Sequence, residues 1–291
     1  MLCWAGAGIA VKEALVVFTP LTLIVLRFSL AIILMLFVGL LFRHSEVLGL
    51  QRVEKQDIPL FILGGLFQPF LYFIFETYTY QSFASPTIAE AMLSTQPIMA
   101  PIFAFIILHE KVTCNNIVGI MISTVGMLLL LLVGANDFAL GNPWGVLLAV
   151  VTVSMSVGYT IVLRRIPKRY TSLSIVFYVQ LVALVLFYIV WGIFDRQPLQ
   201  HTIELLSADI TPMIAVGYLA VFASVMAFIL FCYTVRQIGV TRANVFNNVR
   251  PVFTALLMWV IFDEQLPLWK WVGIIVIVIG LFISQKQRKI E

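Results

Sequence analysis

Two short polar stretches interrupt apolar runs of this 291-residue sequence, and their residue types suit the binding of a polar solute. The first, AEAMLSTQP, spans residues 89–97, and the second, ANVFNNVRP, spans residues 243–251. Their side chains offer carboxylate, hydroxyl, amide and guanidinium groups, which recognise a solute by charge and by hydrogen bonds. The candidate binding residues are Glu90, Ser94, Gln96, Asn244, Asn247, Asn248 and Arg250.

The spacing within each stretch places polar groups on one face of a helix. Glu90, Ser94 and Pro97 fall at i, i+4 and i+7, and two asparagines and a proline repeat this spacing in the second stretch. Proline removes a helical hydrogen bond and bends the helix, so we expect Pro97 and Pro251 to act as hinges. Bent helices with polar groups at the bend line cavities in membrane proteins. Each asparagine can instead bond between helices. We favour a cavity because the pattern occurs twice.

Charged residues inside the apolar runs have two interpretations. Arg250 falls near the middle of its run, where insertion into a bilayer costs roughly 2.5–3.5 kcal/mol unless the side chain faces protein, a carboxylate or water. The charged residues within runs are Lys12, Glu13, Arg27, Glu76, Glu90 and Arg250, and their charges sum to zero. They can form internal ion pairs, or they can line a cavity of both signs that suits a zwitterion such as an amino acid. A carboxylate with a raised pKa in such a cavity can carry a coupling proton.

Four further residues belong to the candidate cavity. Lys12 and Glu76 are included for their charge. Tyr72 and Tyr159 lie within apolar runs near the expected cavity, where each ring can line the cavity or fill a helix contact.

The composition places these residues in a membrane protein. Hydrophobic residues make up 62% of the chain and charged residues 11%, and the mean hydropathy is +1.05. A soluble domain carries about 25% charged residues, so lipid must cover much of this surface. The three cysteines are far apart and give neither a disulfide framework nor a metal-ligand spacing.

The apolar runs are long enough to cross a bilayer, which takes about 20 residues. We expect nine full spans, near residues 20–42, 58–80, 84–108, 115–134, 143–164, 171–194, 212–235, 239–262 and 268–285. Residues 1–17 resemble part of a tenth span. Comparison with the second half predicts that this truncated first helix begins about a dozen residues upstream of Met1.

The distribution of basic residues predicts the orientation, because cytoplasmic loops are enriched in Lys and Arg. With a cytoplasmic N-terminus, 13 of the 18 Lys and Arg residues fall on the cytoplasmic side, two fall outside and three lie within spans. The cytoplasmic ones are Arg43, Arg52, Lys55, Lys111, Arg164, Arg165, Lys168, Arg169, Arg236, Arg242, Lys286, Arg288 and Lys289. Both termini are therefore expected inside, and the net charge of +4 needs no nucleic-acid partner.

An internal repeat divides the chain into two halves. An offset of 154 residues aligns Thr87 with Thr241, Pro97 with Pro251 and several further pairs without a gap; an offset of 152 residues aligns the region upstream. The expected repeats are residues 1–134 and 143–285, followed by a cytoplasmic tail at 286–291. Five is an odd number of spans, so the second repeat is inverted. Inverted repeats are frequent in secondary transporters, which bind substrate where the repeats meet.

The sequence resembles the EamA-type branch of the drug/metabolite transporter superfamily. The stretch FTPLTLIVLRFSLA (18–31) is similar to the family's second span. The segments at 101–126 and 251–280 are similar to its signature, in which a glutamate ends the fourth or ninth span and glycines punctuate the next. The family usually has glycine before that glutamate, whereas His109 and Asp263 stand here. The resemblance implies an all-α fold of ten helices, a central cavity and export of small metabolites, often amino acids.

We therefore expect a secondary transporter in the bacterial inner membrane, acting on a small polar metabolite by alternating access, without a cofactor, as a monomer or homodimer. One alternative is an exporter of lipophilic cations from the same superfamily, which Arg250 near the site argues against. A channel or membrane sensor is another alternative, although the sequence has no selectivity-filter motif and no appended domain. The sequence has no HExxH, Gly-x-Ser-x-Gly or phosphate-loop motif, which argues against an enzyme.

Overall fold

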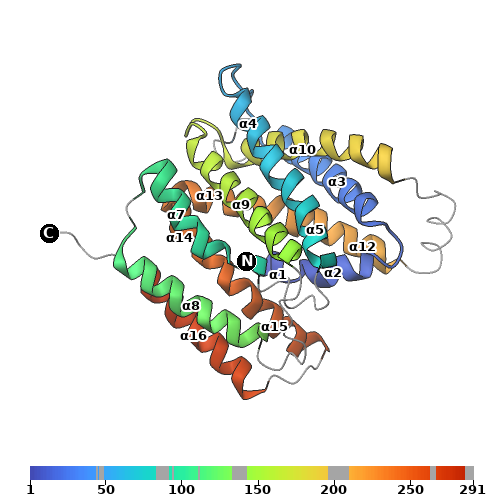
Figure 1. Ribbon diagram of the computed structural model, residues 1–291. Helices are drawn as coiled ribbons and strands as arrows, with labels where there is room; N and C mark the ends of the chain where they lie inside the picture. Colours follow the sequence, from blue (N-terminus) through green and yellow to red (C-terminus); the bar gives the residue numbers. More distant parts are fainter. Residues whose placement is uncertain are drawn as a thin grey trace. The chain divides into compact units, whose positions relative to one another are not determined.

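The computed structural model describes residues 1–43, 45, 49–82, 92–93, 95–110, 112–132, 143–195, 210–262 and 267–285. Every regular element in these ranges is a helix (Figure 1). In chain order these are α1 (Leu2–Ala5), α2 (Ala7–Ala14), α3 (Pro20–Leu41), α4 (Ile58–Gly65), η1 (Leu66–Leu71), α5 (Tyr72–Ser82), α7 (Gln96–Leu108), α8 (Cys114–Leu132), α9 (Pro143–Arg165), α10 (Ser172–Phe194), α12 (Thr211–Tyr218), η2 (Leu219–Met226), α13 (Ala227–Ile238), α14 (Val240–Val245), η3 (Phe246–Val249), α15 (Arg250–Phe262) and α16 (Leu268–Gln285).

Several of these helices have the length and hydropathy of membrane spans. Among the described residues, five continuous helical stretches qualify: Pro20–Leu41, Ile58–Thr79, Pro143–Arg165, Ser172–Phe194 and Thr211–Ile238. Three shorter apolar helices cover Gln96–Leu108, Cys114–Leu129 and Leu268–Ser284. The chain is therefore an all-α polytopic membrane protein, as its composition predicts.

The helices form two compact units, and each unit draws on both halves of the sequence. The α3–α10 unit contains Cys3–Phe70 and Arg165–Tyr233. The α8–α16 unit contains Met1–Leu2, Leu71–Arg164 and Thr234–Glu291. Each unit is named after a pair of helices, one from each half, that pack against each other within it.

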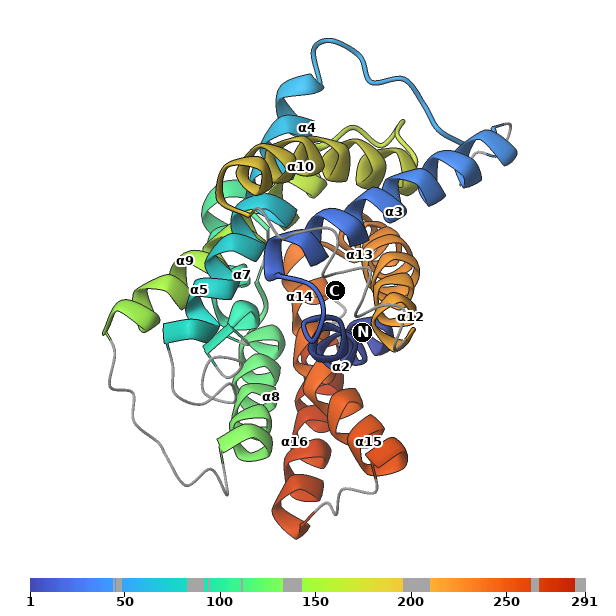
Figure 2. The same ribbon diagram turned by 90° about the vertical axis from the view of Figure 1, so that its right-hand side faces the viewer.

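In the α3–α10 unit, the two helices that name it are antiparallel neighbours (Figures 1 and 2). The hydroxyl of Thr19 caps α3 by accepting from the Thr22 amide at 3.2 Å, and Thr171 caps α10 by accepting from the Ser174 amide at 3.0 Å. These caps lie 152 residues apart in sequence. Asp195, at the end of α10, accepts hydrogen bonds from Thr19 and Thr22, and this ties the two helices together at one end.

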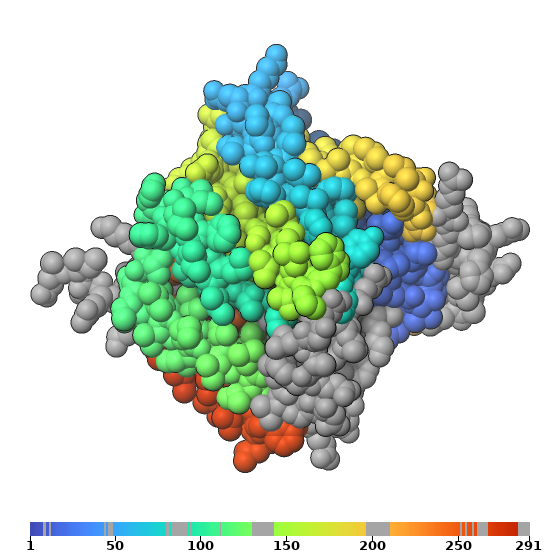
Figure 3. Space-filling model, viewed as in Figure 1, coloured from blue at the N-terminus to red at the C-terminus, as the bar shows by residue number. Residues whose placement is uncertain are grey.

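In the α8–α16 unit, glycines bring the helix backbones into direct contact. A methyl group added at Gly119 would lie 2.5 Å from the Gly280 carbonyl oxygen, and one added at Gly126 would lie 2.8 Å from the Gly273 carbonyl oxygen. The helices are therefore antiparallel. The two contacts are equivalent under the internal repeat, because the 154-residue offset aligns Gly119 with Gly273 and Gly126 with Gly280. Figure 3 shows α8 lying over α16 on one face. This contact lies within a single chain.

The third and eighth spans both depart from regular α-helix. The π-helical segments η1 and η2 interrupt them at nearly equivalent positions of the two halves. In η1, Pro69 removes one backbone donor, and Gln68 has an extended backbone (φ −147°, ψ 121°). Segments of this kind are frequent near functional sites.

Candidate functional site

The second polar stretch folds as three short helical segments within the α8–α16 unit. Residues 240–245 form α14, residues 246–249 form the 3₁₀ segment η3, and α15 begins at Arg250. Pro251 therefore stands in the first turn of α15, not in the middle of a single bent helix. Proline cannot donate to the carbonyl four residues earlier, so the chain tightens into a 3₁₀ turn just before it.

Three amide side chains meet where α14 and η3 approach α7. Gln96, the first residue of α7, donates from Nε2 to Oδ1 of Asn244 at 2.6 Å. Asn247 donates from Nδ2 to the same oxygen at 3.2 Å. Asn244 is buried, whereas Gln96 and Asn247 are partly exposed. The cluster thus joins the two predicted stretches and leaves amide groups at its edge for a solute.

The buried end of the cluster is held by backbone and by α9. Nδ2 of Asn244 donates to the Val240 carbonyl at 2.8 Å and lies 3.5 Å from the Thr160 hydroxyl. The amide of Asn244 is therefore fixed in orientation, with its oxygen directed at Gln96 and Asn247. A fixed amide can present its neighbours to a ligand with little loss of side-chain entropy.

Asn248 makes the interhelical contact that the sequence analysis gave as the alternative to a cavity role. It is fully buried, and its Nδ2 donates to the Ser123 hydroxyl of α8 at 2.8 Å. This is the interhelical bond that a lone intramembrane asparagine commonly makes. Asn248 therefore positions η3 against α8 through one N–H of its side-chain amide.

The remaining candidates make none of the hydrogen bonds of the amide cluster that are described above, or they lie outside what the structure describes. Tyr72 and Glu76 lie one turn apart on α5, where the Tyr72 hydroxyl donates to the carboxylate at 2.8 Å. Tyr159 is fully buried in α9, and Pro97 is buried in the first turn of α7. Arg250 is partly exposed at the start of α15. Outside the described residues or side chains lie Lys12, Glu90, Ser94 and the ring of Pro251.

Glu110 makes a connection that the sequence motif alone did not reveal. Its carboxylate accepts from the amide of Val240 at 3.1 Å and from the amide and hydroxyl of Thr241 at 3.4 Å, so it caps the start of α14. Arg164 lies 3.9 Å from the same carboxylate. Gly239, which lies beside Glu110, has φ +89°, and glycine is the residue type that readily adopts this backbone conformation. A signal did exist, because Glu110 and Thr241 each have a counterpart of the same type 154 residues away.

His109 occupies the position where the family usually has glycine. Its backbone is left-handed, with φ 53° and ψ 31°, and it ends α7. Left-handed residues that follow a helix are most often glycine, which explains the family preference. His109 therefore forms the same left-handed turn, although its side chain makes this backbone conformation less favourable than it is for glycine.

Arg27 is satisfied inside the α3–α10 unit. It is buried, its Nε donates to the Ser224 hydroxyl in η2 at 3.1 Å, and its guanidinium lies 5.0 Å from the centre of the Phe28 ring. Gln180 of α10 donates to the Ser224 carbonyl at 2.6 Å. Arg27 therefore helps to join α3 to η2, and Gln180 joins α10 to the same residue of η2.

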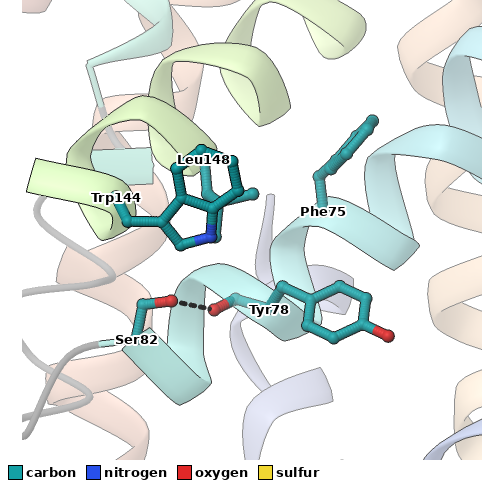
Figure 4. A pocket seen from close by; sticks show the side chains of 5 residues that line it. All are labelled: Phe75, Tyr78, Ser82, Trp144 and Leu148. Atoms are coloured by element: carbon teal, nitrogen blue, oxygen red, sulfur yellow. Dashed lines mark hydrogen bonds between the residues drawn. The ribbon is translucent and has the colours of Figure 1, made fainter.

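An aromatic groove lies between α5 and α9 of the α8–α16 unit (Figure 4). It has a volume of about 360 Å³ and is lined by Phe75, Tyr78, Ser82, Trp144 and Leu148. The Ser82 hydroxyl donates to the Tyr78 carbonyl at 2.7 Å, as in a helix where serine bonds one turn back. The lining contains no charged side chain, so this groove suits an apolar occupant better than a polar solute.

Known proteins resemble the whole chain. The model of the EamA-like transporter family matches residues 1–132 and 143–285. The uncharacterized transporter YetK of Bacillus subtilis is 25% identical over 98% of this chain and 84% of its own. An S-adenosylmethionine/S-adenosylhomocysteine transporter of Chlamydia trachomatis (serovar D) is 27% identical over 91% of this chain and 80% of its own. One crystal structure, 19% identical, shares the fold with a TM-score of 0.80 over 97% of this chain and 94% of its own.

Proposed function

The chain belongs to the EamA-like transporter family, and on this premise we propose that it moves a small zwitterionic metabolite across the bacterial cell membrane by alternating access. Family membership makes it an integral membrane transporter and not an enzyme. The proposal adds the substrate class, the direction of export and the residues that bind. The amide cluster of Gln96, Asn244 and Asn247 carries it, because it joins both polar stretches and is only partly buried.

The chemistry of the cluster suits a substrate with both donors and acceptors. Gln96 and Asn247 each direct one N–H at Asn244, so each keeps a second N–H and its oxygen for a ligand. Neutral amides can bind a carboxylate through N–H and an ammonium through C=O. Arg250, three residues after Asn247, adds a cation for the carboxylate.

The internal repeat supports a proposal about which residue pairs with Arg250 when no substrate is bound. The 154-residue offset places Gln96 in correspondence with Arg250, and Glu90 in correspondence with Asn244. Gln96 donates to Asn244, and we propose that the equivalent contact of the other repeat would join Arg250 to Glu90. We propose that this pair opens when the substrate carboxylate takes its place on Arg250. Protonation of Glu90 is one route by which transport can be coupled to protons.

The relatives guide the choice of substrates. A curated relative is named as a transporter of S-adenosylmethionine and S-adenosylhomocysteine. Both compounds carry an α-amino acid group, which has the two charges that the proposed site would recognise. We therefore propose amino acids and amino acid derivatives as the substrate class, exported in the physiological direction.

Counterflow in proteoliposomes tests the function. Vesicles that hold the purified protein are loaded with one unlabelled compound and mixed with a labelled trace of the same compound. We expect accumulation with an amino acid or an S-adenosyl compound, and none with sugars or cationic dyes. Accumulation of cationic dyes alone would establish the lipophilic-cation exporter instead. Flux without counterflow would indicate a channel.

A further inference from the structure

The α3–α10 unit carries a second groove, which lies between the start of α4 and α10. It has a volume of about 390 Å³, within the range of small-ligand sites at roughly 300–1,000 Å³. Its apolar walls include Ile58, Phe61, Ile62, Leu181 and Val182, and Arg52 stands among the lining residues. Ile58 and Ile62 are 41% and 49% exposed, so one wall of the groove is open at the side. An exposed apolar side on a helix long enough to span a membrane is suited to contact with lipid.

The two helices that border the groove are in close contact with each other. A methyl group added at Gly65 would lie 2.6 Å from the Val179 carbonyl oxygen, so α4 and α10 touch there through their backbones. Figures 1 and 2 both show α4 beside α10.

Hydrogen bonds to the start of α10 hold the segment that contains Arg52. The Gln51 amide donates to the Ser174 hydroxyl at 2.9 Å, and the Gln51 side-chain oxygen accepts from the Thr171 amide at 2.7 Å. The Glu54 amide donates to the Tyr170 hydroxyl at 3.0 Å. Arg52 thus lies between two anchored residues, which keep its backbone in place beside the groove.

The nearby carboxylates are already paired with another cation. Arg169 lies 2.9 Å from a carboxylate oxygen of Glu54 and also pairs with Asp57. Arg52 is exposed and has no ion-pair partner among the described residues. The apolar groove is therefore accompanied by one positive charge that the described part of the protein does not neutralise.

We propose that this groove binds an anionic glycerophospholipid, with its phosphate on Arg52 and an acyl chain along Ile58, Ile62 and Val182. An acyl chain is surrounded by apolar groups both in the bilayer and in the groove, so the groove alone gives little binding free energy. A headgroup contact is needed to hold one lipid there, and a basic residue near the membrane surface supplies that contact. The groove between α5 and α9 has a similar volume but no charged lining residue, so it lacks this selectivity. The site is independent of the transported substrate.

Native mass spectrometry of the detergent-purified protein tests the site. Phosphatidylglycerol is titrated against phosphatidylcholine with the same chains, and bound lipid is counted for each variant. We expect selective retention of phosphatidylglycerol by the wild type. Arg52→Gln should lower its affinity about fivefold, the equivalent of about 1 kcal/mol for one basic residue at the surface. Val182→Trp should reduce binding by filling the groove.

Lys55→Gln is the matched control, because it removes the same charge from an exposed residue that does not line the groove. Thermal unfolding in detergent checks that all variants are folded. Equal binding of the two lipids would overturn the proposal, as would an equal loss in Arg52→Gln and Lys55→Gln. A dimer that Val182→Trp dissociates would show that a second copy, and not a lipid, occupies the groove.

Discussion

At the residue scale, Asn248 and Ser123 should contribute to stability as a pair. Each loses one buried interhelical hydrogen bond when changed to alanine, which costs roughly 1 kcal/mol in free energy of unfolding. The double variant should cost less than the sum of the two, because both single changes break the same bond. Thermal unfolding in detergent measures this. Strictly additive losses would mean that the bond is not made in the folded protein.

The Asp57 cluster predicts a pH dependence of stability. The Tyr170 hydroxyl donates to Asp57 and Arg169 pairs with it, and these contacts lower the pKa of the Asp57 carboxyl. A carboxyl with a lowered pKa in the folded state stabilises the fold above its ordinary pKa of about 3.9. This stability is lost as the pH falls through the lowered folded value.

The melting temperatures of wild type and Asp57→Asn, measured from pH 7 to pH 3, check this dependence. The advantage of the wild type should be constant between pH 7 and about pH 5 and should shrink below about pH 4. An advantage that grows on acidification would contradict the proposed pairing.

At the residue scale, the sequence singled out two stretches whose amide side chains meet in the structure, but it did not predict every hydrogen-bond partner. The period of a helix placed Asn244 and Asn248 on one face, and both are buried on it. Whether an asparagine bonds to a helix or to a solute depends on what faces it, and Ser123 lies 125 residues away from Asn248 in sequence. The fully buried ring of Tyr159 fits the helix-packing role that the sequence analysis weighed against a place in the cavity.

At the element scale, the contact between α8 and α16 depends on glycine. A methyl group at Gly119 would lie 2.3 Å from the Ser284 amide nitrogen, and one at Gly280 would lie 2.4 Å from the Ser123 amide nitrogen. Backbone atoms of packed helices cannot move aside singly, so Gly119→Ala should force the helices apart. We expect a loss of roughly 1–3 kcal/mol, the usual cost of overpacking.

Gly192→Ala is the control for this packing prediction, because nothing lies within 4 Å of the added methyl group. Alanine favours a helix over glycine by up to about 1 kcal/mol, so this variant should be as stable as the wild type or more stable. Folded yield and melting temperature in detergent distinguish the two variants. A Gly119→Ala protein that melts with the wild type would show that the helices are not in backbone contact.

At the element scale, the sequence pattern predicts the long helices but not the short departures from α-helix. Hydropathy predicted the long spans well, because lipid imposes their length and composition. It did not predict η1, η2 or η3, because local departures from α-helix depend on tertiary contacts and on single residues such as Pro69 and Pro251. The 154-residue offset aligns Gly119 with Gly273 and Gly126 with Gly280, but it does not show which helices these glycines bring together.

At the scale of the whole molecule, the charge bias predicts the topology. Reporter fusions after Asn136 and Ser207 should read as external, and fusions after Glu54 and Arg169 should read as internal. Alkaline phosphatase and a fluorescent protein, fused at each point, give complementary signals. A reversed pattern would contradict both the orientation and the argument from Lys and Arg.

The central claim, that Arg250 and the amide cluster bind a zwitterion, is tested most directly by counterflow with Arg250→Gln. The variant removes an expensive intramembrane charge, so membrane insertion and folded yield should be unchanged while accumulation of the amino acid or S-adenosyl substrate is abolished. Lys168→Gln, which removes an exposed charge, should transport like the wild type. If Arg250→Gln instead misfolds, and exchanging the charges of Arg250 and Glu90 restores folding, Arg250 is a structural counter-ion and the account of the site is wrong.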